Sequence, residues 1–184
     1  MRGAPETYDA LARLLAYPTE GFAARVAADV AAIARDVPEA GDELVPFALF
    51  VASHELGDCE EAYVSTFDVN AERALEVGWQ VFGEQYARGA FLVRMREMLR
   101  QCGVAESYEL PDHMTHVLRV LPRIETAQSQ ALVESALVPA LRRILGDAKG
   151  KDGPYSGVLR AVARIVAPDD AAFAGTTNLE AIHE

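Results

Sequence analysis

Apolar side chains recur every three to four residues along most of this chain, which is the spacing of one face of an α-helix. The first such face consists of Tyr8, Leu11, Ala12 and Leu15. The residue before a proline avoids the helical backbone region, so Pro18 is predicted to end the first helix and Pro38 the second. We place the start of the second helix near Thr19, because threonine is a common helix N-cap.

The middle of the chain predicts helices of very different polarity. Residues 44–56 are apolar nearly all round, which is typical of a central, buried helix, and Gly57 is expected to close it. Residues 58–68 predict a short helix with an acidic first turn, which is a favourable position for negative charge. Residues 71–89 contain interleaved glycines and only weak periodicity, so we expect part helix and part loop there.

The second half of the chain contains four predicted helices. Residues 91–102 form the first, which the following glycine ends, and Asp112 is a good N-cap for the next. Residues 125–145 form a long helix in which Pro139 predicts a kink, and residues 155–166 form the last helix.

Nothing in the sequence indicates strands or a second folded unit. No segment alternates apolar and polar residues over a strand-like length, and there is no internal repeat or change of composition. The sequence therefore predicts an all-α fold, a single-domain helical bundle of roughly eight helices. We assign residues 1–168 to this bundle and residues 169–184, which have little periodicity, to a mobile C-terminal tail.

The charge of the chain narrows the classes of partner. Its 184 residues carry a formal net charge of −11 at pH 7, with a pI of about 4.8. A negative surface repels nucleic acid and anionic membranes, so neither is an expected partner. The charge suits a basic or amphipathic peptide, although a role in solubility alone also explains it.

The sequence also predicts a cytoplasmic protein. It contains no signal-peptide pattern and no apolar run of the roughly 18 residues that a membrane-spanning helix needs, so we expect no membrane insertion. Cys59 and Cys102 are far apart and belong to no metal-binding pattern, and we interpret them as reduced thiols.

Candidate catalytic chemistry is sparse. The chain has no nucleophile elbow, no phosphate-binding loop and no dinucleotide-binding glycine motif. His113 and His116 are three residues apart and can share a helix face, but no third metal ligand lies near them in the sequence. We therefore expect no cofactor and no catalytic residue, and we keep a helical metal-dependent enzyme using these two histidines as an alternative.

Three features exceed what a purely structural helical domain requires. The first is an acidic and aromatic helix that carries Glu60, Glu61, Tyr63, Phe67 and Asp68. The second is a group of aromatic residues on a glycine-interrupted segment: Trp79, Phe82 and Tyr86. The third is a turn formed by Pro111, Asp112 and His113. Aromatic residues at helical spacing are more often core than site, so these features alone indicate only a helical domain with a peptide groove.

Several short motifs follow one another in an informative order. Residues 14–18 read LLAYP, residues 63–68 read YVSTFD and residues 84–89 read EQYARG. Further along, the chain reads ELPDHM at 109–114, VPAL at 138–141 and GPYSGVLRAV at 153–162. Together, over residues 8–167, they resemble the NarJ/TorD/DmsD family of molybdenum-enzyme assembly chaperones, and most closely its NarJ-type delta-subunit branch.

The resemblance implies an all-helical chaperone that is absent from the mature enzyme. Such proteins bind the apo catalytic subunit of a nitrate reductase or DMSO reductase type enzyme through its N-terminal peptide, often a twin-arginine signal. They hold that subunit until the molybdenum cofactor is inserted, which makes cofactor-biosynthesis proteins further partners. A monomer and a dimer that exchanges helices are both compatible with the sequence, and a structural subunit of a redox complex is a remaining alternative.

The client is less clear than the family. Residues 72–83 depart from the family pattern, because nitrate reductase chaperones carry a more basic and tyrosine-rich stretch there. A related molybdenum enzyme, such as a chlorate or selenate reductase, is therefore an equal candidate.

These observations combine into one hypothesis of binding. The apolar face of the client peptide enters a groove lined by Tyr63, Phe67, Trp79 and Phe82. Client arginines pair with the carboxylates of Glu60, Glu61, Asp68 and Asp112. His113 is expected to donate a hydrogen bond to the peptide, and its titration is expected to tune release with pH.

Overall fold

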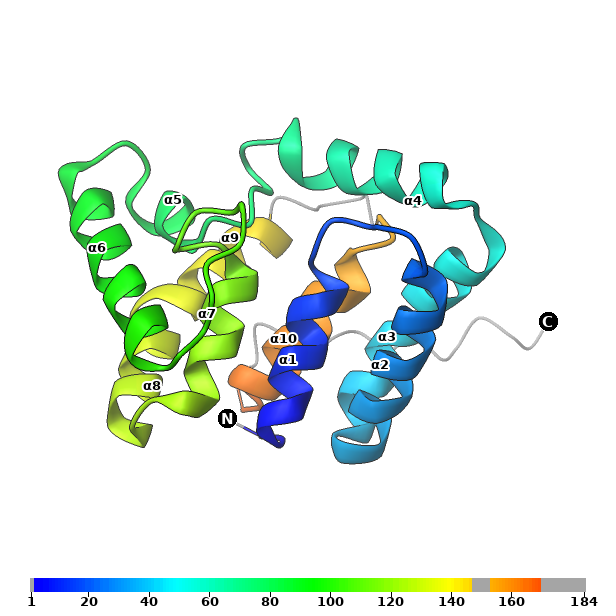
Figure 1. Cartoon of the computed structure of the whole chain (residues 1–184), viewed down its shortest axis with the longest axis horizontal. Helices are drawn as coiled ribbons and strands as arrows, with labels where there is room; N and C mark the ends of the chain where they lie inside the picture. Colours follow the sequence, from blue (N-terminus) through cyan, green and yellow to red (C-terminus); the bar gives the residue numbers. More distant parts are fainter. Residues whose placement is uncertain (1, 147–152, 170–184) are drawn as a thin grey trace.

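Helices and the loops between them account for residues 2–146 and 153–169, the part of the chain that this computed structural model describes (Figure 1). The only strand-like pairing in that part is one isolated antiparallel bridge between Glu76 and His113. The predicted all-α fold is therefore confirmed. The predicted tail at 169–184 lies outside the described residues, apart from Asp169.

The described residues contain ten α-helices, against roughly eight predicted. The first five are α1 (Pro5–Leu14), α2 (Phe22–Asp36), α3 (Pro38–Ser53), α4 (Leu56–Tyr63) and α5 (Val77–Phe82). The others are α6 (Tyr86–Gln101), α7 (Met114–Val120), α8 (Thr126–Leu132), α9 (Val138–Gly146) and α10 (Ser156–Val166). Three short helical turns join them: the π-helical turns η1 (Val64–Asp68) and η3 (Val133–Leu137), and the 3-10 turn η2 (Leu121–Arg123). Part of the difference in number arises because η3 divides the stretch predicted as one kinked helix.

Proline and glycine lie at several helix boundaries, among them the predicted end of the second helix before Pro38 and of the helix before Gly103. α1 and α3 begin with Pro5 and Pro38, which lack the N–H that the first helical turn would leave unpaired. Gly103 follows α6 with a φ of 64°, a left-handed backbone conformation that favours glycine.

Several predicted helix boundaries are wrong, and α3, for example, begins at Pro38 and not at residue 44. Thr19 does not cap α2, because the chain turns into the helix at Gly21, which has a φ of 75°. Gly57 does not close α3, which ends earlier, but lies in the first turn of α4. That turn is fixed by a capping box between Glu55 and Asp58, which satisfies backbone N–H groups that the helix start leaves free.

α3 is less buried than its apolar sequence suggests. Leu44, Phe47 and Val51 face the core, but Val45 and Leu49 are 50% and 65% exposed. The prediction that this helix is buried all round is therefore wrong, because α2 and α10 pack against it and leave an outer face uncovered. No helix among residues 2–146 and 153–169 is both long and apolar enough to cross a membrane.

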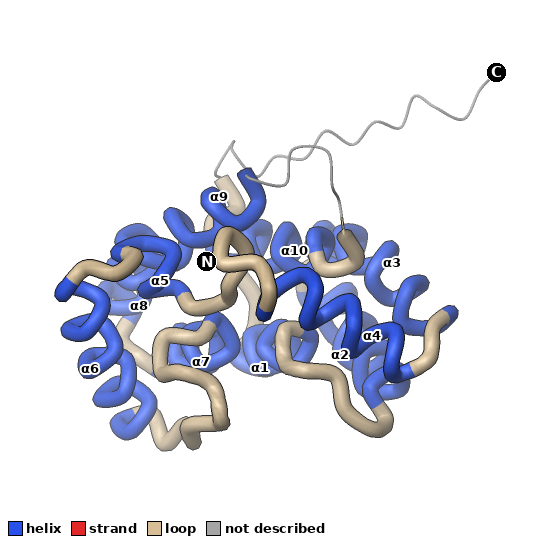
Figure 2. Tube along the Cα trace, turned by 90° about the horizontal axis from the view of Figure 1, so that it is seen from above, coloured by secondary structure: helices blue, strands red, loops and turns tan. Residues whose placement is uncertain are grey.

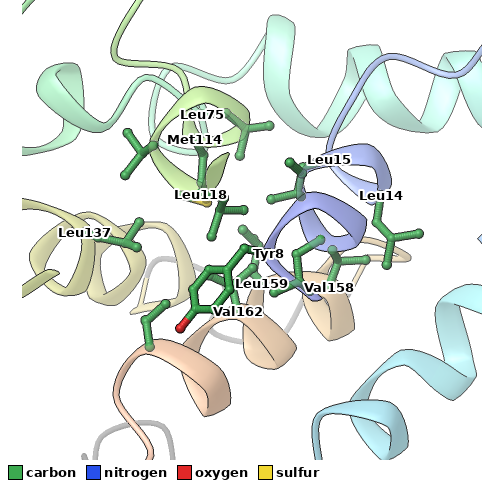
Figure 3. Close-up of a cluster of buried hydrophobic side chains, with 14 of the residues drawn as sticks. Tyr8, Leu14, Leu15, Leu75, Met114, Leu118, Leu137, Val158, Leu159 and Val162 are labelled. Carbon is green, nitrogen blue, oxygen red and sulfur yellow. The ribbon is translucent and has the colours of Figure 1, made fainter. Parts of the chain in front are cut away.

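The core is organised around α1 and α10, which lie next to each other in the middle of the molecule (Figures 1 and 2). α1 packs against α2 and α7, and α10 packs against α3 and α9. Figure 3 shows buried side chains of both helices and of Leu15, which directly follows α1, in this region. The residues of the two helices are Tyr8, Leu14, Val158, Leu159 and Val162, and all six side chains are at most 2% exposed. Full burial of a side chain of this size contributes about 1.5–3 kcal/mol, so this core gives the other helices a rigid support.

α10 approaches α3 closely where the two helices cross. A Cβ atom at Gly157 would overlap the backbone carbonyl oxygen of Glu43. The Glu43 carboxylate accepts hydrogen bonds from Arg160 Nε at 2.9 Å and from Arg164 Nη2 at 3.1 Å. This crossing therefore combines tight backbone contact with a carboxylate held between two guanidinium groups.

Candidate functional site

A cavity of about 450 Å³ lies where η1, the loop after it, α5, the start of α6 and the segment before α7 meet. The strand-like bridge between Glu76 and His113 joins two of these segments. In Figure 1 the segments around the cavity lie in the upper part of the molecule, beyond the end of α4. Aromatic side chains form the floor of this cavity, and charged side chains form its rim.

The aromatic floor consists of Tyr63 and Phe67. Each is 3% exposed, and their ring centroids are 5.2 Å apart in an edge-to-face arrangement. Tyr155, next to the start of α10, packs against both rings at 5.8 and 5.0 Å and so connects the floor to the core. Phe67 belongs to η1, and π-helical turns occur frequently at functional sites.

The acidic rim consists of the carboxylates of Asp68, Glu76 and Glu109. None of the three forms an ion pair or a side-chain hydrogen bond with another described residue. Burial raises the pKa of Asp68, and burial together with the charges of Glu76 and Asp68 raises the pKa of Glu109. Burial, Glu109 and Asp68 also raise the pKa of the Tyr63 hydroxyl. The rim therefore concentrates negative charge that no ion pair within the described chain neutralises.

One guanidinium, that of Arg88, also lines the cavity. Its central carbon lies 5.4 Å from the centroid of the Trp79 ring, which is the distance of a cation–π contact. The indole Nε1 of Trp79 donates a hydrogen bond of 2.9 Å to the carbonyl of Ala71 in the loop after η1. Trp79 is thus held between the loop and α6, and Arg88 covers part of its ring.

Asp112 lies behind the cavity wall, with its side chain fully buried. Its Oδ2 accepts a hydrogen bond of 3.0 Å from the backbone N–H of Gly78 and lies 3.7 Å from Arg88 Nε. A Cβ atom at Gly78 would lie 2.6 Å from the same oxygen, so the close approach requires glycine. Burial raises the pKa of Asp112, and the charge of Arg88 lowers it in part. Asp112 therefore joins α5 to the segment before α7, and the prediction that it caps a helix is wrong.

His113 is the residue that caps α7, and it lines the cavity. Its Nδ1 lies 2.8 Å from the hydroxyl of Thr115 and accepts a longer bond of 3.4 Å from the Thr115 backbone N–H. Burial, together with the charges of His116 and Arg119, lowers the pKa of His113 to about 3. The ring is therefore neutral near pH 7, and because Nδ1 is an acceptor, Nε2 carries the proton. His113 offers the cavity a hydrogen-bond donor, and because its lowered pKa keeps the ring neutral near pH 7, the expected tuning of release by its titration would require a far more acidic pH.

His116 is fully buried and does not line the cavity. Its Nε2 accepts a hydrogen bond of 3.1 Å from the Ser107 backbone N–H, and its Nδ1 lies 2.9 Å from the carbonyl of Leu110. Both ring nitrogens are thus engaged by the backbone, which leaves neither for a metal ion. Within the described ranges, no three His, Cys, Asp or Glu side chains are arranged to hold a metal. Cys59 and Cys102 are free thiols, as the sequence predicts.

The structure brings together only some of the residues that the sequence singled out. The predicted residues that line the cavity are Tyr63, Phe67, Asp68, Trp79 and His113. Those that do not line it are Glu60, Glu61, Phe82, Tyr86, Pro111 and Asp112. Phe82 packs against Phe91, with ring centroids 5.6 Å apart, and Tyr86 is 95% exposed. The two glutamates lie on α4, two and three residues before Tyr63, but do not line the cavity themselves.

Three charged residues that line the cavity were not predicted from the sequence: Glu76, Arg88 and Glu109. Each is a single charged residue without a periodic pattern, and such residues are usually solvated. Two of them had a weak signal, because Arg88 lies in the EQYARG motif and Glu109 is the first residue of the ELPDHM motif.

The part of this chain that is similar to known proteins includes the residues of the cavity. A family profile described as "Nitrate reductase delta subunit" matches residues 30–150. A protein of Bacillus subtilis (strain 168), named "Probable nitrate reductase molybdenum cofactor assembly chaperone NarJ", is 27% identical over 156 residues. That similarity extends over 83% of this chain and 84% of the relative. All residues that line the cavity fall within the family match.

Proposed function

Because the chain belongs to the nitrate reductase delta subunit family, we propose that it is an assembly chaperone for a molybdenum enzyme of the nitrate reductase type. It binds the apo catalytic subunit in the cytoplasm and holds it for insertion of the molybdenum cofactor. It makes and breaks no covalent bond itself. The Bacillus subtilis relative is itself named as a probable nitrate reductase molybdenum cofactor assembly chaperone.

The observation that carries this proposal is the pairing of an aromatic floor with an unneutralised acidic rim in one cavity. Tyr63 and Phe67 provide an apolar surface, and Asp68, Glu76 and Glu109 provide carboxylates without ion-pair partners in the described chain. An amphipathic segment that carries arginine or lysine complements both, because its apolar face displaces water and its cations form charge-assisted pairs.

The cavity also offers hydrogen-bond donors to the backbone of such a segment. His113 presents Nε2–H, because its Nδ1 is engaged by Thr115. Arg88 is 24% exposed in its side chain and adds guanidinium N–H groups. Carbonyl oxygens at the end of a helical segment, which lack partners within the helix, are suitable acceptors for these groups.

We assign the N-terminal peptide of the catalytic subunit, including a twin-arginine signal where one is present, as the segment that enters the cavity. Release must follow cofactor insertion, so the affinity is moderate, at a Kd between micromolar and nanomolar, or about −8 to −12 kcal/mol. Proteins that synthesise or deliver the molybdenum cofactor are the further partners that this role requires.

A titration tests the proposal directly. The probe is a synthetic peptide that copies the N-terminus of the nitrate-reductase-type catalytic subunit encoded in the same genome. Trp79 is the only tryptophan of the chain and lines the cavity, so its fluorescence reports occupation of this site rather than of the general surface. We expect saturable binding, with a fluorescence change and a calorimetric Kd in the range given above.

A matched peptide supplies the control. Replacing its arginines and lysines with glutamine keeps its length and apolar face but removes its charge, and should weaken binding by about tenfold or more. Equal affinity for both peptides, or binding without any change at Trp79, would contradict the proposed site. Co-purification of the chain with the cofactor-loaded enzyme would instead favour a structural subunit.

A further inference from the structure

We propose that His116 is a positioning residue, which acts on a peptide cation through Glu109 without touching the peptide. The proposal rests on the proposed function, because it concerns how one carboxylate of the acidic rim is held in place. His116 itself is fully buried, and Glu109 is half-buried at the cavity.

The imidazole ring of His116 forms hydrogen bonds with the loop of residues 107–110 on both sides of Glu109. The Nε2 atom of His116 accepts from the Ser107 backbone N–H at 3.1 Å and lies 3.2 Å from the Ser107 hydroxyl. The Nδ1 atom of His116 lies 2.9 Å from the carbonyl of Leu110 and donates to it. Since Ser107 precedes Glu109 and Leu110 follows it, the ring fixes the backbone that carries the carboxylate.

Two further contacts hold this loop: the Glu106 carboxylate accepts hydrogen bonds of 3.1 Å from Arg96 Nε, and the Leu110 carbonyl accepts one of 3.0 Å from the His113 backbone N–H. Tyr108 projects fully into solvent and Leu110 is 44% exposed, so neither side chain packs the loop against the core. The Ser107 hydroxyl, which meets His116, also accepts a hydrogen bond of 3.2 Å from the Glu109 backbone N–H. The buried ring is therefore the side chain that hydrogen-bonds to the backbone on both sides of Glu109, in addition to these contacts.

A ligand is expected at Glu109 for a reason that is independent of the acidic rim. His113 lines the same cavity although its side chain is only 3% exposed, and its Nδ1 is engaged by Thr115. Its Nε2 edge has no hydrogen-bond partner among the described residues. A buried donor facing a cavity that also bears unpaired carboxylates fits a peptide that supplies a carbonyl and a cation together.

The position of Glu109 matters because the attraction between charges falls with distance. At an effective dielectric constant of about 20, moving a carboxylate from roughly 4 Å to roughly 6 Å from a cation weakens their attraction enough to lower affinity about tenfold. Loosening the loop at His116 is therefore expected to remove about a third of the attraction that Glu109 supplies, so the loss of affinity for a basic peptide is smaller than that from removing the Glu109 charge.

The test is a double-mutant cycle with His116→Phe and Glu109→Gln, using the catalytic-subunit N-terminal peptide and its glutamine-substituted copy as probes. Phenylalanine keeps a ring in the buried site but makes neither hydrogen bond. We expect His116→Phe to weaken binding of the basic peptide about tenfold in the wild-type background and to have no further effect in the Glu109→Gln background. Neither substitution should change binding of the uncharged peptide.

Controls separate positioning from general damage. His54→Phe makes the same chemical change at an exposed histidine that does not line the cavity and should leave binding unchanged. Where His116→Phe fails to fold, His116→Gln and Ser107→Ala replace it, because each removes only part of the hydrogen bonding; we expect them to weaken basic-peptide binding less, and only when Glu109 is present.

The outcomes distinguish this inference from the proposed function. If the wild-type chain binds neither peptide, the proposed function fails and the inference fails with it. If the basic peptide binds and Glu109→Gln weakens it, but the His116 variants lose equal affinity with and without Glu109, the role of His116 is merely structural and the inference alone is overturned.

Discussion

Acidic side chains have opposite surroundings in two regions of the molecule, namely the crossing of α3 and α10 and the cavity beside η1. At the crossing, the Glu43 carboxylate is held by Arg160 and Arg164 at hydrogen-bond distance. At the cavity, Asp68 and Glu109 have no such partner within the described chain, and the pKa of each is raised. Both regions are built on helices packed around the same core.

The difference indicates what each region is for. Paired charges and close backbone contact at the crossing stabilise the folded chain itself. Like charges gathered at the cavity cost stability, and such a cost is understandable where a cationic ligand offsets it in the bound state. Asp112 is an intermediate case. It is buried and supports the cavity wall through its hydrogen bond with Gly78, but its distance to Arg88 is long at 3.7 Å.

The largest effect is expected at the crossing. Gly157→Ala places a Cβ atom against the Glu43 carbonyl oxygen and forces α10 away from α3, which should lower the free energy of unfolding by about 2–3 kcal/mol. The matched control is Gly89→Ala on α6, where an added Cβ would meet nothing within 4 Å. That change should stabilise the chain by up to about 1 kcal/mol, because alanine favours helix. Denaturant unfolding measures both, and equal effects would contradict the close approach.

The next largest effect tests the support of the cavity wall. Asp112→Ala leaves the buried N–H of Gly78 without its acceptor and should cost about 1–3 kcal/mol of unfolding free energy. Asp112→Asn keeps an acceptor oxygen and should cost clearly less. Urea melts of both variants decide this. A stable Asp112→Ala variant that had lost only peptide binding would show instead that Asp112 contacts the peptide.

The same substitution, glutamate to glutamine, then tests the difference between the crossing and the cavity. The first of these two variants is at the crossing. Glu43→Gln removes the charge that Arg160 and Arg164 share in a partly buried place, and should lower the free energy of unfolding by about 1 kcal/mol. Glu97→Gln breaks an exposed pair with Arg100 and should have no measurable effect. An unchanged Glu43→Gln variant would mean that the crossing does not depend on charge pairing.

The same change in the cavity has the opposite sign and the smallest size. The pKa of Glu109 in the folded chain is raised above its ordinary value of 4.5, so the folded state holds the proton more tightly than the unfolded one. Wild-type stability from this group is therefore present below that ordinary value and is lost as pH rises through the raised pKa. Glu109→Gln should be more stable than wild type near pH 7, by no more than about 0.5 kcal/mol because solvent screens the site, and equally stable in acid. Thermal melts across this pH range would contradict the account if the variant were less stable at pH 7.

Much of the fold could be predicted from the sequence because its signals are local. The apolar face that includes Tyr8 and Leu11 repeats at helical spacing, and Pro38 and the glycine after α6 mark real boundaries. α3 shows the weakness of this reasoning, because its composition gives no information on which side its neighbours leave open, and Leu49 proved to be exposed.

The site could be predicted only in part because it depends on contacts between distant segments. Asp112 directly precedes a helix and has the residue type of a cap, but it turns inward to Gly78, a partner that no local pattern indicates. Glu109 is an ordinary acidic residue in the sequence and gains its significance only from the neighbouring Glu76 and Asp68. The aromatic pair Tyr63 and Phe67 was recognised because helical spacing and motif coincide there.

The central claim is that the acidic rim binds a basic peptide because its carboxylates lie at the cavity, and not because the chain as a whole is negatively charged. The decisive measurement is the Kd of the catalytic-subunit N-terminal peptide for two triple variants with the same change in net charge. One neutralises the rim, with Asp68→Asn, Glu76→Gln and Glu109→Gln. The other neutralises three exposed acidic residues that do not line the cavity, with Glu20→Gln, Asp42→Asn and Glu125→Gln. We expect the rim variant to lose roughly a hundredfold or more in affinity and the surface variant less than about threefold; equal losses in the two would contradict the claim.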